Sequence, residues 1–305
     1  MTNTLLGGAI ADALGVPFES KPANNPLLLS WDQKTYLGSE HHKLLPGQYS
    51  DDTQFSMAVA ESLIENYGYN PIDISNRYME LFRSGMIRGY GKTTLMAVQN
   101  LMSGKHWTES GIAGSYGNGT AMRAAPFGVY FREYGYRFKE LLEACETDSQ
   151  ITHASDEAKA GSIAIALAAF YASNNDTDEL LDKIWSHLPD SKVKNSIHSL
   201  GSLIDAEHIS TASALGFLGT KADVRMTVPA ALYLFIKVDN YQEAVLAAIN
   251  AGGDTDTTAS IVGALFCAKN GIKGIHSCWI EEVEDRGKLM ILDSQLYNRS
   301  NSSYV

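Results

Sequence analysis

Two segments of the sequence are apolar around nearly the whole circumference of a helix, and they constrain the fold more than any other feature. They read AGSIAIALAAFYA at 160–172 and TASIVGALFCA at 258–268. A helix that is apolar on every side needs neighbours on every side, whereas a surface helix carries only one apolar stripe. The sequence therefore predicts that these two helices lie at the centre of a larger helical assembly.

Helical periodicity continues along the chain, while strand-like alternation bounded by turns is scarce. Turn-forming residues separate the helical runs, and no linker rich in Pro, Ser or Gly divides the chain. We therefore predict an all-α fold over residues 1–305, a compact single-domain orthogonal multi-helix bundle. The predicted helices are Thr53–Asn66, Ile72–Phe82, Thr93–Met102, Asp156–Ala172, Glu179–Leu188, Lys192–Ile204, Thr227–Ile236, Tyr241–Ala251 and Thr257–Lys269.

The composition argues against several classes of function. The net charge of −11 argues against broad binding to nucleic acid or to anionic membranes, since both need a basic face. Three cysteines without CxxC spacing indicate reduced thiols in a cytoplasmic protein. The N-terminus has no basic segment, so we expect no signal peptide, and no apolar run reaches the roughly 20 residues that span a bilayer. A monomer is compatible with the sequence.

Two acidic clusters stand at the starts of apolar helices near opposite ends of the chain. Either cluster alone is explained by helix capping, because Ser and Asp satisfy the free N–H groups of a first turn. Two clusters supply more carboxylates than capping needs, and these would repel one another without a counter-ion. Their all-oxygen donors suit Mg²⁺ or Mn²⁺, as two ions sharing a bridging carboxylate, and lack the His and Cys of zinc sites. The candidate ligands are Ser50, Asp51, Asp52, Asp254, Asp256 and Thr257.

Three further features carry a structural and a functional interpretation. The glycine-rich stretch 111–119, before a TAMRAA segment predicted to be helical, is either a flexible loop or a loop that approaches a phosphate closely. Asp12 in a small-residue helix is either a buried carboxylate bonded to helix-end N–H groups or part of a site. Glu19 and His153 are each either ordinary structural residues or residues of a cleft.

Together these stretches resemble the ADP-ribosylglycohydrolase family, in the family's order and over most of the chain from Leu5 to Ala268. The motifs that carry the resemblance are YSDDT, GSYGNGTAMR, ITH and NAGGDTDTTASIVGA. The resemblance implies a compact all-α fold with a binuclear Mg²⁺ or Mn²⁺ centre in a cleft. It also implies removal of ADP-ribose from a modified protein side chain or a small acceptor.

The resemblance implies roles for individual residues. Ser50, Asp51 and Asp52 match the first ligand group, with Ser50 standing where the family most often has threonine. Asp254, Asp256 and Thr257 match the second group, and Glu19 matches a carboxylate lining the catalytic cleft. The expected substrate-binding residues are Gly114, Ser115, Tyr116, Gly117, Asn118, Gly119 and His153.

The implied reaction is attack of water at the anomeric carbon of the proximal ribose. Glu19, Asp52 or Asp256 would take the proton of the water and assist the leaving group. Two other functions stay open at this point: a two-metal phosphohydrolase or nucleotide hydrolase, and a non-catalytic structural relative.

The acceptor is open between arginine, serine and O-acetyl linkages and modified nucleic acid, the last disfavoured by the acidic charge. We expect the loop 22–48 to decide it. Four aromatic or histidine side chains of that loop either line the cleft mouth or only pack within the loop: Trp31, Tyr36, His41 and His42. Tyr116 either stacks on adenine or ribose or packs within its own loop. The tail Glu281–Val305 is predicted to be a polar surface segment.

Overall fold

The computed structural model describes residues 2–30, 32–133 and 135–299. These ranges contain helices and no β-strand, and their one β-bridge joins Ser39 to Leu44. The predicted all-α fold is therefore confirmed. Trp31 and residues 300–305 of the predicted tail lie outside the described residues.

All of the helices predicted from periodicity are present, with ends that differ from the prediction by at most three residues. Polar N-caps fix several of the starts, since Asn70, Ser155, Ser191 and Asn240 each accept a hydrogen bond from a first-turn N–H. The long helices are α1 (Thr4–Gly15), α3 (Asp51–Asn66), α4 (Pro71–Arg83), α5 (Lys92–Met102), α8 (Tyr136–Thr152), α9 (Asp156–Ser173), α11 (Lys192–Asp205), α13 (Val224–Lys237), α14 (Tyr241–Asn250), α15 (Thr255–Asn270) and α17 (Arg286–Arg299). The short ones are the 3₁₀ helix η1 (Val16–Phe18), α2 (Pro26–Ser30), α6 (Trp107–Ser110), α7 (Ala125–Tyr130), α10 (Leu180–Trp185), α12 (Thr211–Leu218) and α16 (Ser277–Glu282).

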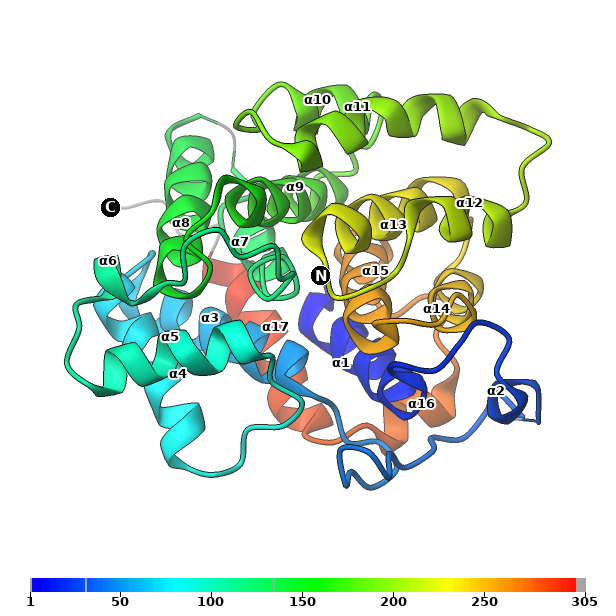
Figure 1. Cartoon of the computed structure of the whole chain (residues 1–305), viewed down its shortest axis with the longest axis horizontal. Helices are drawn as coiled ribbons and strands as arrows, with labels where there is room; N and C mark the ends of the chain where they lie inside the picture. Colours follow the sequence, from blue (N-terminus) through cyan, green and yellow to red (C-terminus); the bar gives the residue numbers. More distant parts are fainter. Residues whose placement is uncertain (1, 31, 134, 300–305) are drawn as a thin grey trace.

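The N-terminal helix α1 lies against α15 at the centre of the molecule (Figure 1). Glycines let the two backbones approach closely, because an added Cβ on Gly7 would lie 2.7 Å from the carbonyl oxygen of Gly263. An added Cβ on Gly263 would in turn lie 2.4 Å from the carbonyl oxygen of Gly7. Both α15 and α9 are buried along most of their length, as their all-round apolar sequences predicted.

Two local predictions were wrong. The TAMRAA segment forms turns, and helix α7 begins only at its last residue, Ala125. The tail predicted to be a polar surface segment forms α17, which buries three leucines and Asp293. The carboxylate of Asp293 accepts the N–H groups of Leu5 and Leu6 at 2.9 and 3.0 Å, so α17 holds the start of α1.

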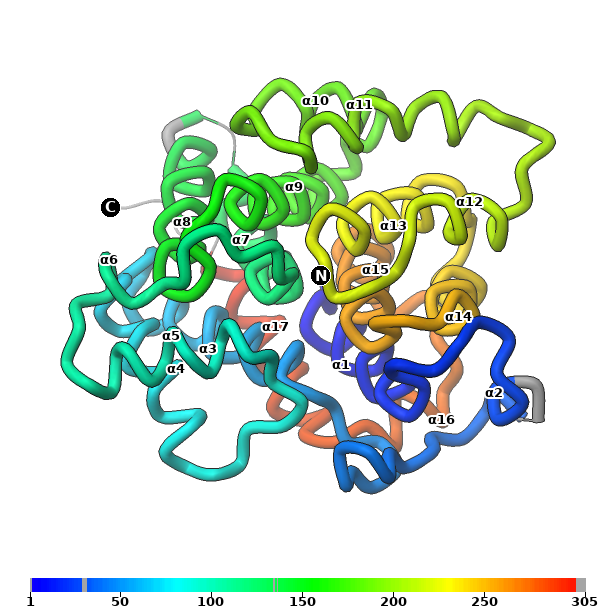
Figure 2. The backbone as a smooth tube through the Cα atoms, viewed as in Figure 1, coloured from blue at the N-terminus to red at the C-terminus, as the bar shows by residue number. Residues whose placement is uncertain are grey.

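The segment between η1 and α3 runs along the edge of the molecule, past α16 (Figure 2). It is tied to α16 because the hydroxyl of Tyr36 donates to the carbonyl oxygen of Trp279 at 2.8 Å. Just beyond α16, the N–H of Glu284 donates to the carbonyl oxygen of Gly47 at 2.9 Å. Across the described ranges, none of the helices has the length and hydrophobicity that crossing a membrane requires.

Candidate metal centre

The two acidic clusters meet where α3 and α15 begin. The hydroxyl of Thr257 lies 3.2 Å from Oδ2 of Asp52, although 205 residues separate them. Oδ2 of Asp52 also accepts the hydroxyl of Ser50 at 3.0 Å. The sequence-distant clusters therefore form one group of oxygen atoms.

Capping does not account for the acids in this group. Ser50 is the N-cap of α3, and its hydroxyl accepts the N–H of Asp52 at 3.3 Å. At the start of α15, Asp254 occupies the N-cap position but makes no capping hydrogen bond. The carboxylate of Asp254 instead accepts the side-chain amide of Asn118 at 2.6 Å. The acids are thus in excess of what the two helix starts use.

Asp12 on α1 has the structural role considered for it, since it holds the start of α3. Its Oδ1 accepts the N–H of Ser50 at 2.9 Å, and its Oδ2 accepts the N–H and the hydroxyl of Thr53 at 3.1 and 2.6 Å. Burial raises the pKa of Asp12 to about 6. This carboxylate fixes the first acidic cluster against the central helix.

The second cluster is oriented by the glycine pair that precedes it. Gly252 and Gly253 have φ of 71° and 79°, a left-handed conformation that glycine adopts without strain. Gly253 exchanges two backbone hydrogen bonds with the segment after Glu19: its carbonyl accepts the N–H of Ser20 at 2.7 Å, and its N–H donates to the carbonyl of Lys21 at 3.1 Å. The turn therefore places Glu19 beside Asp254.

The electrostatics of the group fit a bound divalent cation. Burial raises the pKa values of Asp51 and Asp52 well above the usual range, and the neighbouring carboxylates add to this effect. Burial likewise raises the pKa values of Asp254 and Asp256. Oδ1 of Asp52 is buried and has no hydrogen-bond partner among the described residues. Such a set of crowded hard oxygens is stabilised by Mg²⁺ or Mn²⁺.

Two sets of three carboxylates are close enough to share an ion, with ligand atoms within 4.8 Å of one another. One set is Asp12, Asp52 and Asp256, and the other is Glu19, Asp254 and Asp256. Asp256 belongs to both, which is the arrangement that a carboxylate bridging two ions requires. The ligand roles of all six residues stay predictions, namely those of Ser50, Asp51, Asp52, Asp254, Asp256 and Thr257.

A cavity of about 230 Å³ opens over this group. Its wall contains most of the residues expected to serve the site, namely Glu19, Asp51, Asp52, Asp254, Asp256, Thr257, Gly117, Asn118, Gly119 and His153. Ser50, Gly114, Ser115 and Tyr116 are not part of that wall. Ser50 is fully buried behind it, and the ring of Tyr116 is stacked under the guanidinium of Arg225 at 4.0 Å.

The glycine-rich loop packs directly on His153. An added Cβ on Gly117 would lie 2.9 Å from Nε2 of His153, and one on Gly119 would lie 2.6 Å from its Cε1. Burial, helped by the positive charge of Arg123, lowers the pKa of His153 to about 3. The imidazole is therefore neutral at physiological pH and offers one donor and one acceptor nitrogen.

A buried ion pair supports this loop from behind. The guanidinium of Arg123 bonds to Asp148 at 2.9 Å, to the carbonyl oxygen of Gly119 at 2.7 Å and to the hydroxyl of Thr152 at 2.9 Å. Tyr78 donates to the other oxygen of Asp148 at 2.6 Å. Arg123 therefore points into the interior and joins the TAMRAA segment to α8.

Sequence reasoning missed the start of α5 as a wall of the cavity. Gly89, Gly91, Lys92, Thr93 and Thr94 line it, and the N-cap Gly91 leaves the first-turn N–H groups without a capping side chain. Among the described lining residues Lys92 carries the one formal positive charge. The segment GYGKTT, with glycines before a helix that starts on lysine, was the available signal.

The loop 22–48 contributes unevenly to the site. Tyr36 is buried and bonded to the backbone of α16, so it packs within the fold. His41 is exposed and its ring contacts that of His42 edge-on at 4.5 Å. His42 is not part of the cavity wall, but its Nε2 bonds to the carboxylate of Glu19, which is.

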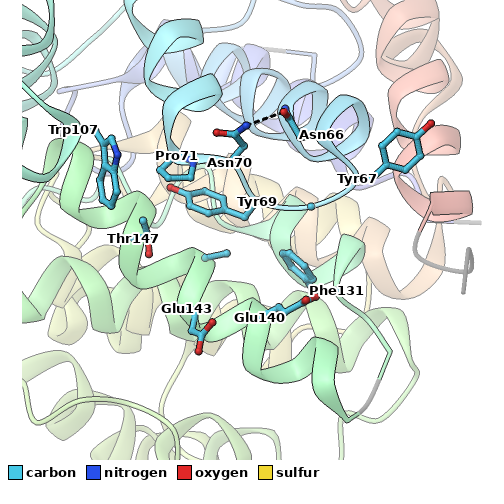
Figure 3. Close-up of a pocket in the computed structure, with 12 residues that line it drawn as sticks. Asn66, Tyr67, Tyr69, Asn70, Pro71, Trp107, Phe131, Glu140, Glu143 and Thr147 are labelled. Carbon is cyan, nitrogen blue, oxygen red and sulfur yellow. Dashed lines mark hydrogen bonds between the residues drawn. The ribbon is translucent and has the colours of Figure 1, made fainter. Parts of the chain in front are cut away.

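A second and larger cavity, of about 650 Å³, lies between the α3–α4 connection and α8 (Figure 3). Trp107 and Tyr69 form one side of it, and Glu140 and Glu143 of α8 lie on the other. It gathers no group of carboxylates close enough to share an ion. We therefore place the candidate site at the smaller cavity, where the acids converge.

Comparison with known proteins gives matches over nearly the whole chain. The ADP-ribosylglycohydrolase family model matches residues 1–304. An uncharacterized protein of Archaeoglobus fulgidus is 31% identical, over 97% of this chain and 95% of its own length. ADP-ribosylhydrolase ARH3 of Xenopus tropicalis is 26% identical, over 97% of this chain and 95% of its own length.

Two further likenesses extend the comparison. ADP-ribosylarginine hydrolase Tri1 of Serratia proteamaculans is 25% identical, over 96% of this chain and 77% of its own length. A solved structure of an ADP-ribosylglycohydrolase-related protein complex has the same fold, with a TM-score of 0.73 and 24% identity over 98% of this chain and 96% of that chain. Since the family model spans nearly the whole sequence, the chain belongs to the ADP-ribosylglycohydrolase family.

Proposed function

We propose that the protein hydrolyses the bond between ADP-ribose and a protein side chain or small acceptor, using two Mg²⁺ or Mn²⁺ ions. The family makes it a hydrolase of glycosidic bonds. The observation that carries the finer proposal is the meeting of two carboxylate clusters and a glycine-rich loop at one cavity. A phosphohydrolase or a non-catalytic role is not favoured by any contact in the site.

The residues proposed to hold the ions are Ser50, Asp51, Asp52, Asp254, Asp256 and Thr257. Bound divalent cations would supply Lewis-acid activation of a water and of the ribose hydroxyls. The pKa values of the buried carboxylates are raised by burial and by their mutual repulsion. A bound cation would offset that repulsion. Asp12 keeps the first cluster in place through the start of α3.

We propose that the carboxylate of Glu19 accepts the proton of the attacking water. Asp52 and Asp256 are buried, while the side chain of Glu19 keeps 23% of its surface exposed and can exchange protons with solvent. Departure of the acceptor leaves positive charge on the ribose, which nearby carboxylates stabilise. The carboxyl group of Glu19, once protonated by the attacking water, would pass that proton to the released acceptor.

The part of the cavity wall at the start of α5 suits the diphosphate of ADP-ribose. The N–H groups at the start of α5 are free of a capping side chain, and Lys92 adds a positive charge there. The loop from Gly117 to Gly119 presents backbone close to neutral His153, with Asn118 tied to Asp254. Tyr116 lies further out and would meet the distal part of the substrate.

A panel of defined substrates tests the proposal. ADP-ribosyl-arginine peptide, ADP-ribosyl-serine peptide and O-acetyl-ADP-ribose would each be incubated with Mg²⁺ or Mn²⁺, and free ADP-ribose measured by mass spectrometry. We expect release from at least one of them, and none from Asp254→Asn. No release from any substrate by a protein that binds Mn²⁺ would overturn the proposal.

The buried free thiols of Cys145 and Cys267 support a cytoplasmic location.

A further inference from the structure

Glu19 differs from the other acids around the cavity in how it is held. Asp51, Asp52 and Asp256 lie in the first turns of α3 and α15, and Asp254 occupies the N-cap position of α15, so a long helix fixes each backbone. Glu19 follows the three-residue helix η1 and precedes Ser20, which has φ of 61°. Its side chain also has three rotatable bonds, so the backbone alone does not place its carboxylate.

His42 is what holds that carboxylate. Nε2 of His42 donates to Oε2 of Glu19, and this is the one side-chain hydrogen bond of Glu19 among the described residues. The contact is well covered, since the His42 side chain is only 12% exposed. A glutamate with a single protein partner depends on that partner for its rotamer.

His42 is itself fixed by the turn that carries it. Its backbone N–H donates to the hydroxyl of Ser39 at 3.3 Å, and Ser39 and Leu44 exchange two backbone hydrogen bonds of 2.9 Å. The backbone of Gly89 covers the other side, because an added Cβ there would lie 3.9 Å from Cε1 of His42. The turn at 39–44 is therefore held by hydrogen bonds, and the imidazole that it carries lies between Glu19 and the segment that leads to α5.

We propose that His42 is a positioning residue, which holds one oxygen of Glu19 so that the carboxylate faces Asp254 and Asp256. The inference rests on the proposed function, in which Glu19 handles the proton of the attacking water. It gives the loop 22–48 a definite part in the chemistry: the turn at 39–44 sets the geometry of an acid that lies outside the loop. Removal of the contact lets Glu19 turn toward solvent without disturbing the ligands on α3 and α15.

Steady-state kinetics on the substrate that the wild type hydrolyses gives the first test. We expect His42→Ala to lower kcat by about 10- to 100-fold, the usual effect of losing a residue that orients a reacting group, with KM unchanged. His42→Gln, which keeps a donor near the position of Nε2, should restore most of kcat. His208→Ala, which removes an exposed histidine between α11 and α12, is the matched control and should behave as wild type.

A double-mutant cycle and a crystal structure make the proposal specific. If His42 acts through Glu19, His42→Ala should lower kcat only slightly further in a protein that already carries Glu19→Gln. The crystal structure of His42→Ala should show the Glu19 carboxylate displaced from its wild-type position. An unmoved Glu19, full kcat in His42→Ala, or an equal loss of kcat in the Glu19→Gln background would overturn the proposal. A wild type without activity would refute the proposed function, while the Glu19 displacement would still decide the role of His42.

Discussion

Asp254 shows how one carboxylate has opposite effects on the metal-free and the metal-bound protein. Burial raises its pKa, and the charge of Glu19 adds to that effect, so the ionised form is disfavoured without a cation. Asp254→Asn keeps an acceptor for the amide of Asn118 but removes the charge. We expect the metal-free variant to unfold at the same or a higher temperature than wild type.

The same substitution should weaken stabilisation by Mn²⁺. Binding at 100-fold excess over Kd stabilises a protein by about 2.7 kcal/mol, and Asp254→Asn should lose most of this gain. Thermal unfolding with and without Mn²⁺ measures both effects, with the exposed Asp239→Asn as control. Equal Mn²⁺ stabilisation of wild type and Asp254→Asn would contradict the ligand role.

Gly119 is the residue at which the loop leaves no room for a side chain. An added Cβ would lie 2.6 Å from Cε1 of His153, a distance that real contacts do not reach, so the loop or the imidazole must move. We expect Gly119→Ala to lower kcat/KM at least about 10-fold, since a displacement of about 1 Å can cost 100-fold. Gly201→Ala in α11 has open space around it and should retain full activity, so a similar loss in both variants would refute the explanation.

At the level of elements, the start of α5 gives the cavity its positive side. Lys92 is exposed at the rim and faces a cavity whose other charged wall residues are all acidic. We expect Lys92→Ala to raise KM about 10-fold with little change in kcat, because the lysine would bind diphosphate equally in ground and transition states. The measurement is KM at low and high salt, with exposed Lys105→Ala as the control. An unchanged KM at low salt would exclude Lys92 from substrate binding.

The elements also show which parts of the fold the sequence could predict. Periodicity identified the central helices because their apolar residues pack on every side, whatever their neighbours are. It missed α17, since Asp293 places an acid in the middle of the buried face and resembles a solvent position. It misassigned TAMRAA, a segment whose Arg123 is fixed by Asp148, a partner distant in sequence.

The residues of the candidate site likewise divide into those that the sequence could predict and those that it could not. The acidic clusters were recognisable because both lie at helix starts in excess of what capping needs. The support of Asp12 for α3 was open from sequence, since its partners are identified only by the packing of α1. The contact of His42 with Glu19 was not predictable, because it depends on the path of an irregular loop. Helix periodicity gives no information on such a path.

For the molecule as a whole, Asp293 makes the contact between α17 and α1 depend on pH. Its carboxylate is fully buried against the first turn of α1, and burial raises its pKa from 3.8 to about 7. Between about pH 4 and pH 7 the folded protein therefore retains a proton that the unfolded chain has lost. The stability that this proton contributes is complete below pH 4 and is lost as the pH rises through about 7.

The free energy of unfolding of wild type should accordingly fall across that window by more than that of Asp293→Asn. The buried acids of the site have pKa values shifted in the same direction, so wild type and variant must be compared in the same metal-free buffer, where only the Asp293 contribution differs. Asparagine offers one oxygen to two N–H groups, which adds a loss of about 1–3 kcal/mol that does not vary with pH. Urea unfolding at intervals from pH 4 to pH 8 measures the slope, with exposed Asp205→Asn expected to follow wild type. Parallel curves for wild type and Asp293→Asn would mean that Asp293 is already ionised in the folded protein near pH 4. The two N–H donors would then lower its pKa by as much as burial raises it.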